Sequence, residues 1–304
     1  MVWFLEKKPE STGLEAVIRR PLRTVIGARS NRKSALANRH LEIHDSVMAW
    51  DSQQYLRFEA QRTQPCRDLV RRISLDAPVT IADLGCGPGN STAELRNRWP
   101  EAKIVGIDNS AEMLDRARSD HPGIEWVNAD IASWAPAAPL DIIFSNAALQ
   151  WVPRHRELLP RLIGHVVPGG FLAIQMPANI DALPHRLMQE LAASPDWQDH
   201  FPHQVREWDT REASDYYDIL APQSDTLDIW TTTYLHVLPD AAAVVEWYKG
   251  TGLRPWLDAL PGDAEREKFI GDYAERIARY YHPRPDGQVL FPFERIFLLA
   301  QAKK

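Results

Sequence analysis

The feature that most constrains this chain is a run of closely spaced glycines, Asp83-Leu84-Gly85-Cys86-Gly87-Pro88-Gly89. The apolar segment from Val79 to Leu84 predicts a buried parallel strand, and the polar run from Asn90 to Arg98 predicts the helix that follows it. Glycine has no Cβ, so the main chain of such a turn can approach a ligand closely, and the helix start offers free N–H groups. The pattern therefore predicts a ligand site at a strand-to-helix turn of an α/β fold.

The spacing of the glycines separates two classes of adenosine cofactor. A dinucleotide-binding turn requires a third small residue at the position of Asn90, whereas the third glycine of this chain falls one position early. The carboxylate of Asp83 would also repel a pyrophosphate, so a nucleotide oxidoreductase is disfavoured. An acidic glycine loop suits S-adenosylmethionine better, because this cofactor carries an ammonium group and no phosphate.

Two further carboxylates follow the next predicted strands. Asp108 comes after Lys103 to Ile107, and Asp130 comes after Ile124 to Val127, so that Asp83, Asp108 and Asp130 are 25 and 22 residues apart. One βα unit fits each interval, and the carboxyl ends of parallel strands form the edge where open α/β sheets bind ligands. We expect Asp108 to accept the ribose hydroxyls and Asp130 to bind the adenine amino group.

The composition limits the partners of the protein. The chain has 304 residues and a net charge of −6, which argues against a nucleic-acid surface. No apolar run approaches the ~20 residues that span a bilayer, and no signal peptide is recognisable, so we expect a cytoplasmic protein without a membrane partner. Cys66 and Cys86 are too few for a disulfide framework, and no His or Cys spacing indicates a metal site.

The first 46 residues differ from the rest of the chain. They contain nine Lys and Arg against five Asp and Glu without a sustained apolar period, which predicts a flexible basic extension. From residue 47 onward, predicted strands alternate with helices, which indicates a parallel sheet with right-handed crossovers. Pro168-Gly169-Gly170 is expected to end the helix before the fifth strand. The predicted strands are Thr80 to Leu84, Lys103 to Asp108, Ile124 to Asn128, Asp141 to Asn146, Phe171 to Gln175, Thr226 to Val237 and Phe293 to Ala300.

The glycine loop, Gly106-Ile107-Asp108-Asn109-Ser110, Asn128-Ala129-Asp130 and Pro168-Gly169-Gly170 together resemble the class I S-adenosylmethionine-dependent methyltransferases. The resemblance implies a Rossmann-like, doubly wound seven-stranded sheet with an antiparallel last strand and a mainly helical lid inserted in the C-terminal half. It places a methyltransferase domain at 47–304, with a cofactor-binding half at about 75–177 and lid and substrate-binding insertions at about 178–225 and 239–287. By position, the expected cofactor-binding residues are Asp83, Gly85, Cys86, Gly87, Gly89, Asp108, Asn109, Met113, Asp130, Ile131 and Asn146.

Segments outside this core narrow the resemblance. Ser145 to Trp151, Ile174 to Pro177, Asp228 to Tyr234 and Gly250 to Leu257 are similar to a branch of the family that methylates a small tricarboxylic acid, trans-aconitate. This resemblance implies a carboxyl O-methyltransferase that yields a monomethyl ester and S-adenosylhomocysteine. The first segment is also similar to malonyl-carrier-protein methyltransferases of biotin synthesis. Three alternatives therefore stay open: a methyltransferase that acts on a malonyl carrier protein, a methyltransferase that acts on another small anion, and a non-catalytic cofactor sensor.

The implied chemistry sets requirements for the substrate site. A carboxylate is already ionised at neutral pH, so its attack on a sulfonium methyl requires no catalytic base and no metal. Positioning would supply the catalysis, by roughly 7–11 kcal/mol. A tricarboxylate needs counter-charges, which the planar fork of Arg provides best, and Arg254 is expected in a rigid loop between Gly252 and Pro255. The expected substrate-binding residues are Tyr55, Arg62, Trp151, Tyr248, Arg254, Tyr281 and Arg295.

Overall fold

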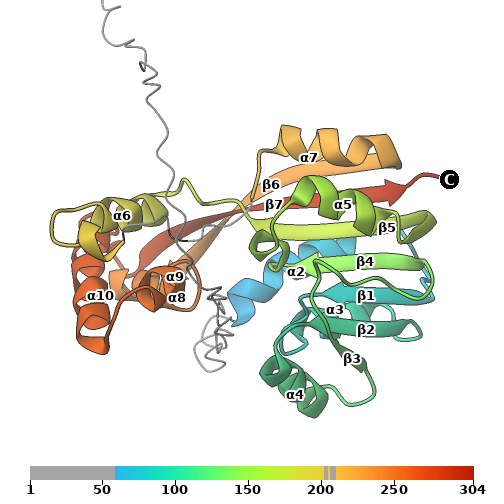
Figure 1. Cartoon of the computed structure of the whole chain (residues 1–304), viewed down its shortest axis with the longest axis horizontal. Coiled ribbons are helices and arrows are strands. Elements are labelled where there is room, and N and C mark those ends of the chain that lie inside the picture. Colours follow the sequence, from blue (N-terminus) through green and yellow to red (C-terminus); the bar gives the residue numbers. More distant parts are fainter. Residues whose placement is uncertain (1–58, 202–204, 206–209) are drawn as a thin grey trace, which may run out of the picture. The chain divides into compact units, whose positions relative to one another are not determined.

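The structure is a computed structural model that describes residues 59–201, 205 and 210–304. The predictions for residues 1–46 and for the domain boundary at residue 47 lie outside this part of the chain. Within the described residues, seven strands form one sheet in the order β3-β2-β1-β4-β5-β7-β6 (Figure 1).

The sheet is parallel except at one strand. Strands β1 to β5 pair in parallel, whereas β7 is antiparallel both to β5 and to β6. This arrangement confirms the predicted doubly wound, seven-stranded sheet with an antiparallel last strand. The strands are β1 (Thr80–Leu84), β2 (Lys103–Asp108), β3 (Glu125–Asn128), β4 (Leu140–Asn146), β5 (Val166–Pro177), β6 (Ser224–Leu238) and β7 (Val289–Ala302).

Helices cover both faces of this sheet and form a further group in the C-terminal half. They are α2 (Glu59–Arg72), α3 (Asn90–Arg98), α4 (Ala111–Asp120), α5 (His155–Ile163), α6 (Leu183–Ala192), α7 (Ala213–Leu220), α8 (Ala241–Lys249), α9 (Arg254–Asp258) and α10 (Asp263–Ala278). Short 3-10 turns lie at η1 (Leu149–Trp151), η2 (Gln198–His200) and η3 (Ala221–Gln223). None of the helices in the described part of the chain combines the length and the apolar character needed to span a bilayer.

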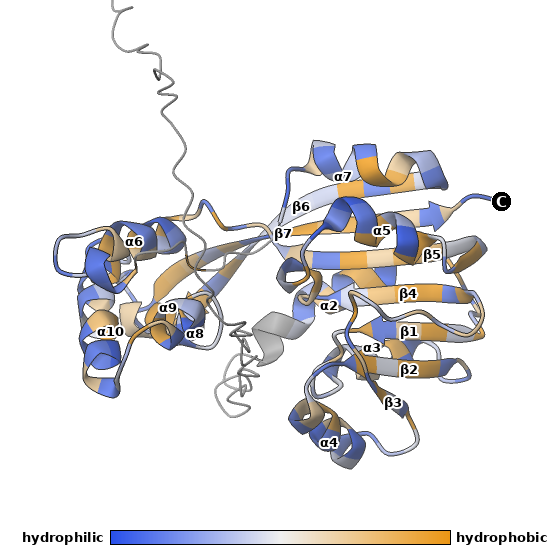
Figure 2. Cartoon of the chain, viewed as in Figure 1, coloured by the Kyte–Doolittle hydropathy of each residue, from blue (hydrophilic) through white to orange (hydrophobic). Residues whose placement is uncertain are grey.

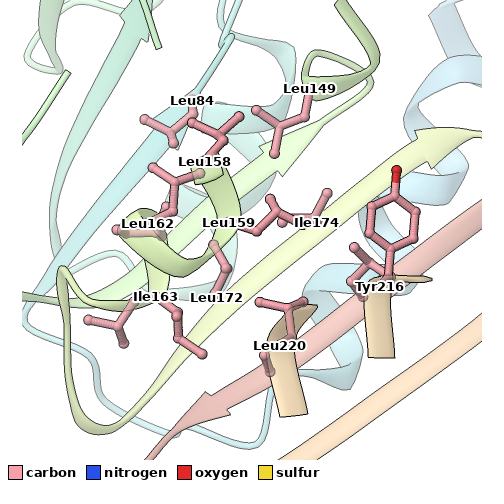
Figure 3. Packing of buried hydrophobic residues seen from close by; sticks show 14 of the residues in the cluster. Leu84, Leu149, Leu158, Leu159, Leu162, Ile163, Leu172, Ile174, Tyr216 and Leu220 are labelled. Carbon is pink, nitrogen blue, oxygen red and sulfur yellow. The ribbon is translucent and has the colours of Figure 1, made fainter. Parts of the chain in front are cut away.

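Successive residues of each strand point to opposite faces of the sheet, which builds two apolar layers. Ile81, Phe144, Ala173 and Phe297 pack with α2 and α3 in one cluster of buried side chains. Their strand neighbours pack in a second cluster with α5 and α7. Figure 3 shows this second cluster, in which Leu158, Leu159 and Leu162 of α5 lie beside Leu172 and Ile174 of β5 and Tyr216 and Leu220 of α7. Each fully buried Leu or Ile stabilises the fold by about 1.5–3 kcal/mol.

A third apolar cluster joins α6, α8 and α10 to the end of β6 and to the start of β7, which precedes the pairing of β7 with β5. It includes Leu238 of β6, with Val289, Phe291 and Phe293 of β7. Figure 2 shows hydrophobic colour along β4 and much hydrophilic colour on α10, as expected for a core strand and an amphipathic helix. The segment 178–225, expected as one insertion, is divided, because α6 belongs to this third cluster while α7 packs on the sheet.

The predicted starts of the fifth and the last strand were wrong, because β5 begins at Val166 and β7 at Val289. Helix α5 ends at Ile163 and its C-cap is Gly164, so Pro168-Gly169-Gly170 does not end it. This tripeptide lies inside β5, at an irregularity where the partners of β4 shift from Leu140↔Val166 to Ile142↔Phe171. A Cβ at Gly170 would lie 2.5 Å from the carbonyl oxygen of Asp141, so glycine allows the two strands to approach there.

Candidate functional site

The glycine loop joins β1 to α3 and is held against β2. The backbone N–H groups of Gly85 and Cys86 donate to the carbonyl of Ile107, at 2.7 and 3.1 Å. Gly85, Gly87 and Gly89 have φ of 71°, 53° and 95°, a region that favours glycine. A Cβ at Gly85 would lie 2.1 Å from Cβ of Ala148, whereas a Cβ at Gly87 would meet no atom within 4 Å. The backbone at Gly87 is therefore open to close approach by a ligand.

Asp83, the last but one residue of β1, is fully buried beneath this loop. The hydroxyls of Ser91 and Thr92, in the first turn of α3, donate to its Oδ2 at 2.7 and 2.6 Å. Oδ1 is also buried and has no hydrogen-bond partner among the described residues. Burial raises the pKa of Asp83 to about 6, although the two hydroxyls oppose the rise. A buried carboxylate oxygen without a partner is costly, and a cationic ligand group would satisfy it.

Asp108, at the end of β2, connects the glycine loop to the start of α4. Its Oδ2 accepts from the N–H of Gly87 at 2.9 Å, and its Oδ1 accepts from the N–H of Ser110 at 2.8 Å. Burial raises the pKa of Asp108, and the N–H groups of Ser110, Gly87 and Asn109 oppose the rise. A carboxylate has about four acceptor sites, so Asp108 can still accept from a ligand hydroxyl. Met113 is buried below, and its N–H donates to Ser110 Oγ at 3.3 Å.

The loop after β3 carries Asp130, which is exposed, and Ile131, which is buried. Asp130 Oδ1 accepts from the N–H of Ala132 at 2.8 Å. Arg161 of α5 donates from Nη2 to the carbonyls of Ile131 and Ala132 at 2.8 and 2.9 Å, and from Nη1 to the carbonyl of Trp134. This guanidinium fixes the loop that presents Asp130 and Ile131. Sequence reasoning missed Arg161, because an Arg near the end of a helix is ordinary.

Asn146 ends β4 and opens the segment to η1. Its Oδ1 is buried and lacks a partner among the residues that the structure describes. The next residue, Ala147, has φ of 56°, and its N–H donates to the carbonyl of Gln175 at 2.9 Å. Gln150 Nε2 in turn donates to the carbonyl of Ala147 at 2.8 Å. A left-handed alanine costs about 1–2 kcal/mol, so these bonds hold a strained turn beside the glycine loop.

Two of the expected substrate residues lie close together. Tyr248 of α8 is fully buried, and its hydroxyl accepts from Asn179 Nδ2 at 3.0 Å. Burial raises the pKa of Tyr248 well above its usual value; Tyr281 adds to the rise, whereas Asn179 and the charge of Arg295 oppose it. Tyr248 and Tyr281 both pack edge-on against Phe291, with ring centroids 5.9 and 6.0 Å from it. Asn179 follows Ala178, whose N–H donates to the carbonyl of Glu294, the neighbour of Arg295, at 3.0 Å. Burial also raises the pKa of Tyr281, to about 12.

Arg295 lies on β7 and is only 4% exposed. Its Nη1 donates to Gln175 Oε1 at 3.5 Å, and its guanidinium lies 4.6 Å from the ring centroid of Phe293. Gln175 and Asn179 were not expected at the site. A neutral amide gives no charge signal, although Gln175 belongs to a segment that the sequence resemblance already used.

The other expected substrate residues lie in different surroundings. Arg254 is not in a loop but begins helix α9, where its Nε lies 3.5 Å from Asp258 Oδ2 and its side chain is 32% exposed. Trp151 ends η1 and packs, partly buried, against the cluster of α6, α8 and α10. Tyr55 and the side chain of Arg62 lie outside the described residues. Within the described part of the chain, no group of three or more His, Cys, Asp or Glu could hold a metal ion.

Comparisons with known proteins agree with this arrangement. A family model described as a methyltransferase domain matches residues 81–170. The chain is 51% identical over 251 residues to a protein named trans-aconitate 2-methyltransferase from Azoarcus sp. (strain BH72), covering 83% of this chain and 98% of that protein. It is 48% identical over 252 residues to a protein of the same name from Rhodopseudomonas palustris (strain BisB18), with the same two shares.

A solved structure shows the same fold. The YcgJ protein of Bacillus subtilis superimposes with a TM-score of 0.52 at 16% identity, covering 79% of this chain and 99% of that one. At this identity the likeness concerns the fold alone.

Proposed function

Because this chain belongs to the trans-aconitate 2-methyltransferase family, we propose that it methylates one carboxylate of trans-aconitate, with S-adenosylmethionine as the methyl donor. The products are a monomethyl ester and S-adenosylhomocysteine. The observation that carries the proposal is 51% identity over 98% of a relative with this name. For the alternative, a malonyl-carrier-protein substrate, the net charge of −6 offers little attraction for an acidic carrier.

The residues at the sheet edge suit this cofactor. The unpartnered Oδ1 of Asp83 is suited to the ammonium group, and Asp108 to the two ribose hydroxyls. The open backbone of Gly87 allows close contact, and Asp130 with Ile131 would flank the adenine. Cys86, Gly85, Gly89, Asn109 and Met113 would complete the contacts. When bound, S-adenosylmethionine supplies an electrophilic methyl group on a sulfonium.

On the substrate side, the chain's residues bind and orient an anion. The substrate carboxylate is already ionised, so no residue has to remove a proton. Arg295 and Tyr248 offer a cation and a hydroxyl in a buried setting, where electrostatic attraction is stronger than in water. Trp151 and Tyr281 would form walls that exclude water from the nucleophile. Arg254, Arg62 and, outside the described residues, Tyr55 stay proposed as further contacts.

The proposal extends to the surroundings of the enzyme. We retain residues 239–287 as a substrate-binding insertion, since Tyr248 and Tyr281 come from it and are buried. We also retain a cytoplasmic location, and we place no nucleic acid among the partners because the net charge is −6.

The test is an assay with methyl-labelled S-adenosylmethionine and a panel of di- and tricarboxylates, with the ester identified by mass spectrometry. We expect trans-aconitate to be turned over well above the other acids. Cofactor binding without transfer to any acid would instead indicate a cofactor sensor. Absence of cofactor binding would refute the proposal altogether.

A further inference from the structure

A row of polar side chains crosses three neighbouring strands at the edge of the sheet. Asn146 of β4 is the register partner of Gln175 of β5, and Arg295 of β7 is the partner of Pro177, two residues further along β5. Residues two apart on a strand share a face. Because Phe144, Ala173 and Phe297 face α2 and α3, the three polar residues project from that same face, which also carries Asp83.

Gln175 is the most unusual member of this row. Its side chain is fully buried, yet its Nε2 has no hydrogen-bond partner among the described residues. Its Oε1 accepts from Arg295 Nη1 at 3.5 Å, which fixes the oxygen toward the guanidinium and turns the amide N–H groups away from it. A buried donor without a partner destabilises a fold by about 1–3 kcal/mol, so a ligand acceptor is the expected complement.

The hydroxyl of Tyr248 offers a second donor nearby. Because its oxygen accepts from Asn179 Nδ2, its own proton is available for a ligand. The ring of Tyr248 packs edge-on against His185, with ring centroids 5.1 Å apart. A Cβ at Gly252 would lie 2.7 Å from the His185 ring and 3.2 Å from the Tyr248 ring, so glycine allows this packing. The hydroxyl is therefore held in one orientation.

We propose that Gln175 is a further substrate-binding residue, which donates from Nε2 to the carboxylate that Arg295 and Tyr248 bind, and that Asn179 is a positioning residue that orients the Tyr248 hydroxyl. The inference rests on the proposed function and deepens it by naming the donors of one carboxylate subsite. A carboxylate has about four acceptor sites, enough for a guanidinium, a hydroxyl and an amide. Two of these three donors are neutral. The subsite therefore places one positive charge beside the cationic methyl donor, whereas a subsite built from two or three arginines would place two or three.

The bound carboxylate is the non-reacting one. A carboxylate that accepts from a cation and two further donors has its charge dispersed, which makes it a poor nucleophile. Such a subsite anchors the substrate and leaves another carboxylate free to react. Gln175 therefore contributes to KM and to the choice of acid, and little to the chemical step.

The decisive variant is Gln175→Leu, which keeps the size of the side chain and removes its donors. We expect the KM for trans-aconitate to rise roughly 10- to 100-fold, with binding of S-adenosylhomocysteine unchanged in calorimetry. The matched control is Gln301→Leu. Gln301 donates to the carbonyl of Gly169 and pairs with Phe171, at the far end of β5 and β7, so its loss should leave KM unchanged.

Three unsaturated dicarboxylates, each lacking a different carboxyl group of trans-aconitate, distinguish contact from a merely structural effect. The acid that lacks the reacting carboxylate should not be methylated at all. Turnover of the acid that lacks the anchored carboxylate should be insensitive to Gln175→Leu, while turnover of the third acid should fall in parallel with that of trans-aconitate. Equal losses for every acid that the wild type methylates, or no loss for any of them, would overturn the inference while wild-type turnover of trans-aconitate upholds the proposed function. A wild-type protein that methylates none of these acids would overturn both.

The role of Asn179 is tested by a double-mutant cycle with Tyr248→Phe. If Asn179 acts by orienting the hydroxyl, then Asn179→Ala should raise KM for trans-aconitate in the wild-type background and have no further effect once the hydroxyl is absent. Independent, additive increases in KM would contradict the positioning role. Thermal unfolding of the four proteins identifies any variant that fails to fold.

Discussion

Replacing Asp83 by Asn should stabilise the protein without cofactor and weaken cofactor binding. Asp83 is fully buried, and burial raises its pKa from 3.8 to about 6. One pKa unit corresponds to about 1.4 kcal/mol, so at neutral pH the ionised side chain destabilises the folded state by about 3 kcal/mol. Asn has the same size, can still accept from Ser91 and Thr92, and carries no charge. We therefore expect the unfolding free energy of Asp83→Asn to exceed that of the wild type near pH 7.5.

The pH dependence identifies the cause. Since the pKa of Asp83 is higher in the folded than in the unfolded chain, the folded state binds more protons between pH 3.8 and about 6. The contribution of protonated Asp83 to the unfolding free energy is therefore fully present below pH 3.8 and is lost as the pH rises to about 6 and above. The variant lacks this titration. In urea unfolding without cofactor, the unfolding free energy of Asp83→Asn minus that of the wild type should increase by about 2 kcal/mol between pH 4.5 and 7.5.

Two results would refute this reasoning. One is a difference between variant and wild type that does not change with pH, and the other is a difference that shrinks as pH rises. The exposed Asp130 provides the control, since Asp130→Asn should change the unfolding free energy by less than about 0.5 kcal/mol. In calorimetry, Asp83→Asn should also raise the Kd for S-adenosylmethionine roughly 10- to 100-fold, because the ammonium loses a charged acceptor.

Gly85→Ala and Gly87→Ala form a matched pair, because both glycines have positive φ but only Gly85 would place a Cβ against Ala148, at 2.1 Å. We expect Gly85→Ala to lower the unfolding free energy by more than about 3 kcal/mol. Gly87→Ala should lower it by about 1–2 kcal/mol and abolish cofactor binding. Equal losses of unfolding free energy in denaturant titrations would contradict this reasoning. Arg161→Gln should raise the KM for S-adenosylmethionine about tenfold and leave that for trans-aconitate unchanged, because it releases the loop after β3; steady-state kinetics with each substrate varied tests this. Gly271 lies in the middle of α10, and a Cβ there would meet no neighbouring atom within 4 Å. Gly271→Ala should therefore raise the unfolding free energy by roughly 0.5–1 kcal/mol, and a decrease in the same titrations would contradict the packing described.

The sequence predicted the strands well wherever apolar runs ended at charged or glycine residues. The predicted bounds of β1 and β2 agree with the structure to the residue, since Asp108 and the glycine loop mark their ends. The start of β5 was wrong for a physical reason. Pro168-Gly169-Gly170 interrupts the apolar pattern, but strand pairing resumes across it, because Gly170 allows the chain to pass close to Asp141.

The two halves of the candidate site differed in how far the sequence could predict them. Asp83 and Asp108 carry charge at strand ends one βα unit apart, and topology alone brings them to one edge. The substrate side depends on pairing that sequence does not reveal. Arg254 was the favoured arginine, yet in the structure it begins a helix and lies beside Asp258, whereas Arg295 is buried against Gln175. Only the register of β5 with β7 brings those two residues together.

The buried polar groups of this edge are explained by function more readily than by stability. Asp83, Gln175 and Arg295 extend the same sheet face that Ile81, Ala173 and Phe297 fill with apolar packing. Apolar residues of similar size would continue that packing and remove the cost of dehydrating a charge. Replacing buried ionic groups by apolar residues often stabilises a protein, by about 1–4 kcal/mol. The charges are instead matched in sign to the proposed ligands, with an anion beside the glycine loop for an ammonium and a cation three strands away, on β7, for a carboxylate. Binding of cofactor and substrate would therefore offset the free energy that burying these charges costs the folded protein. Each ligand should raise the melting temperature of the wild type more than that of a variant in which the charge facing that ligand is removed.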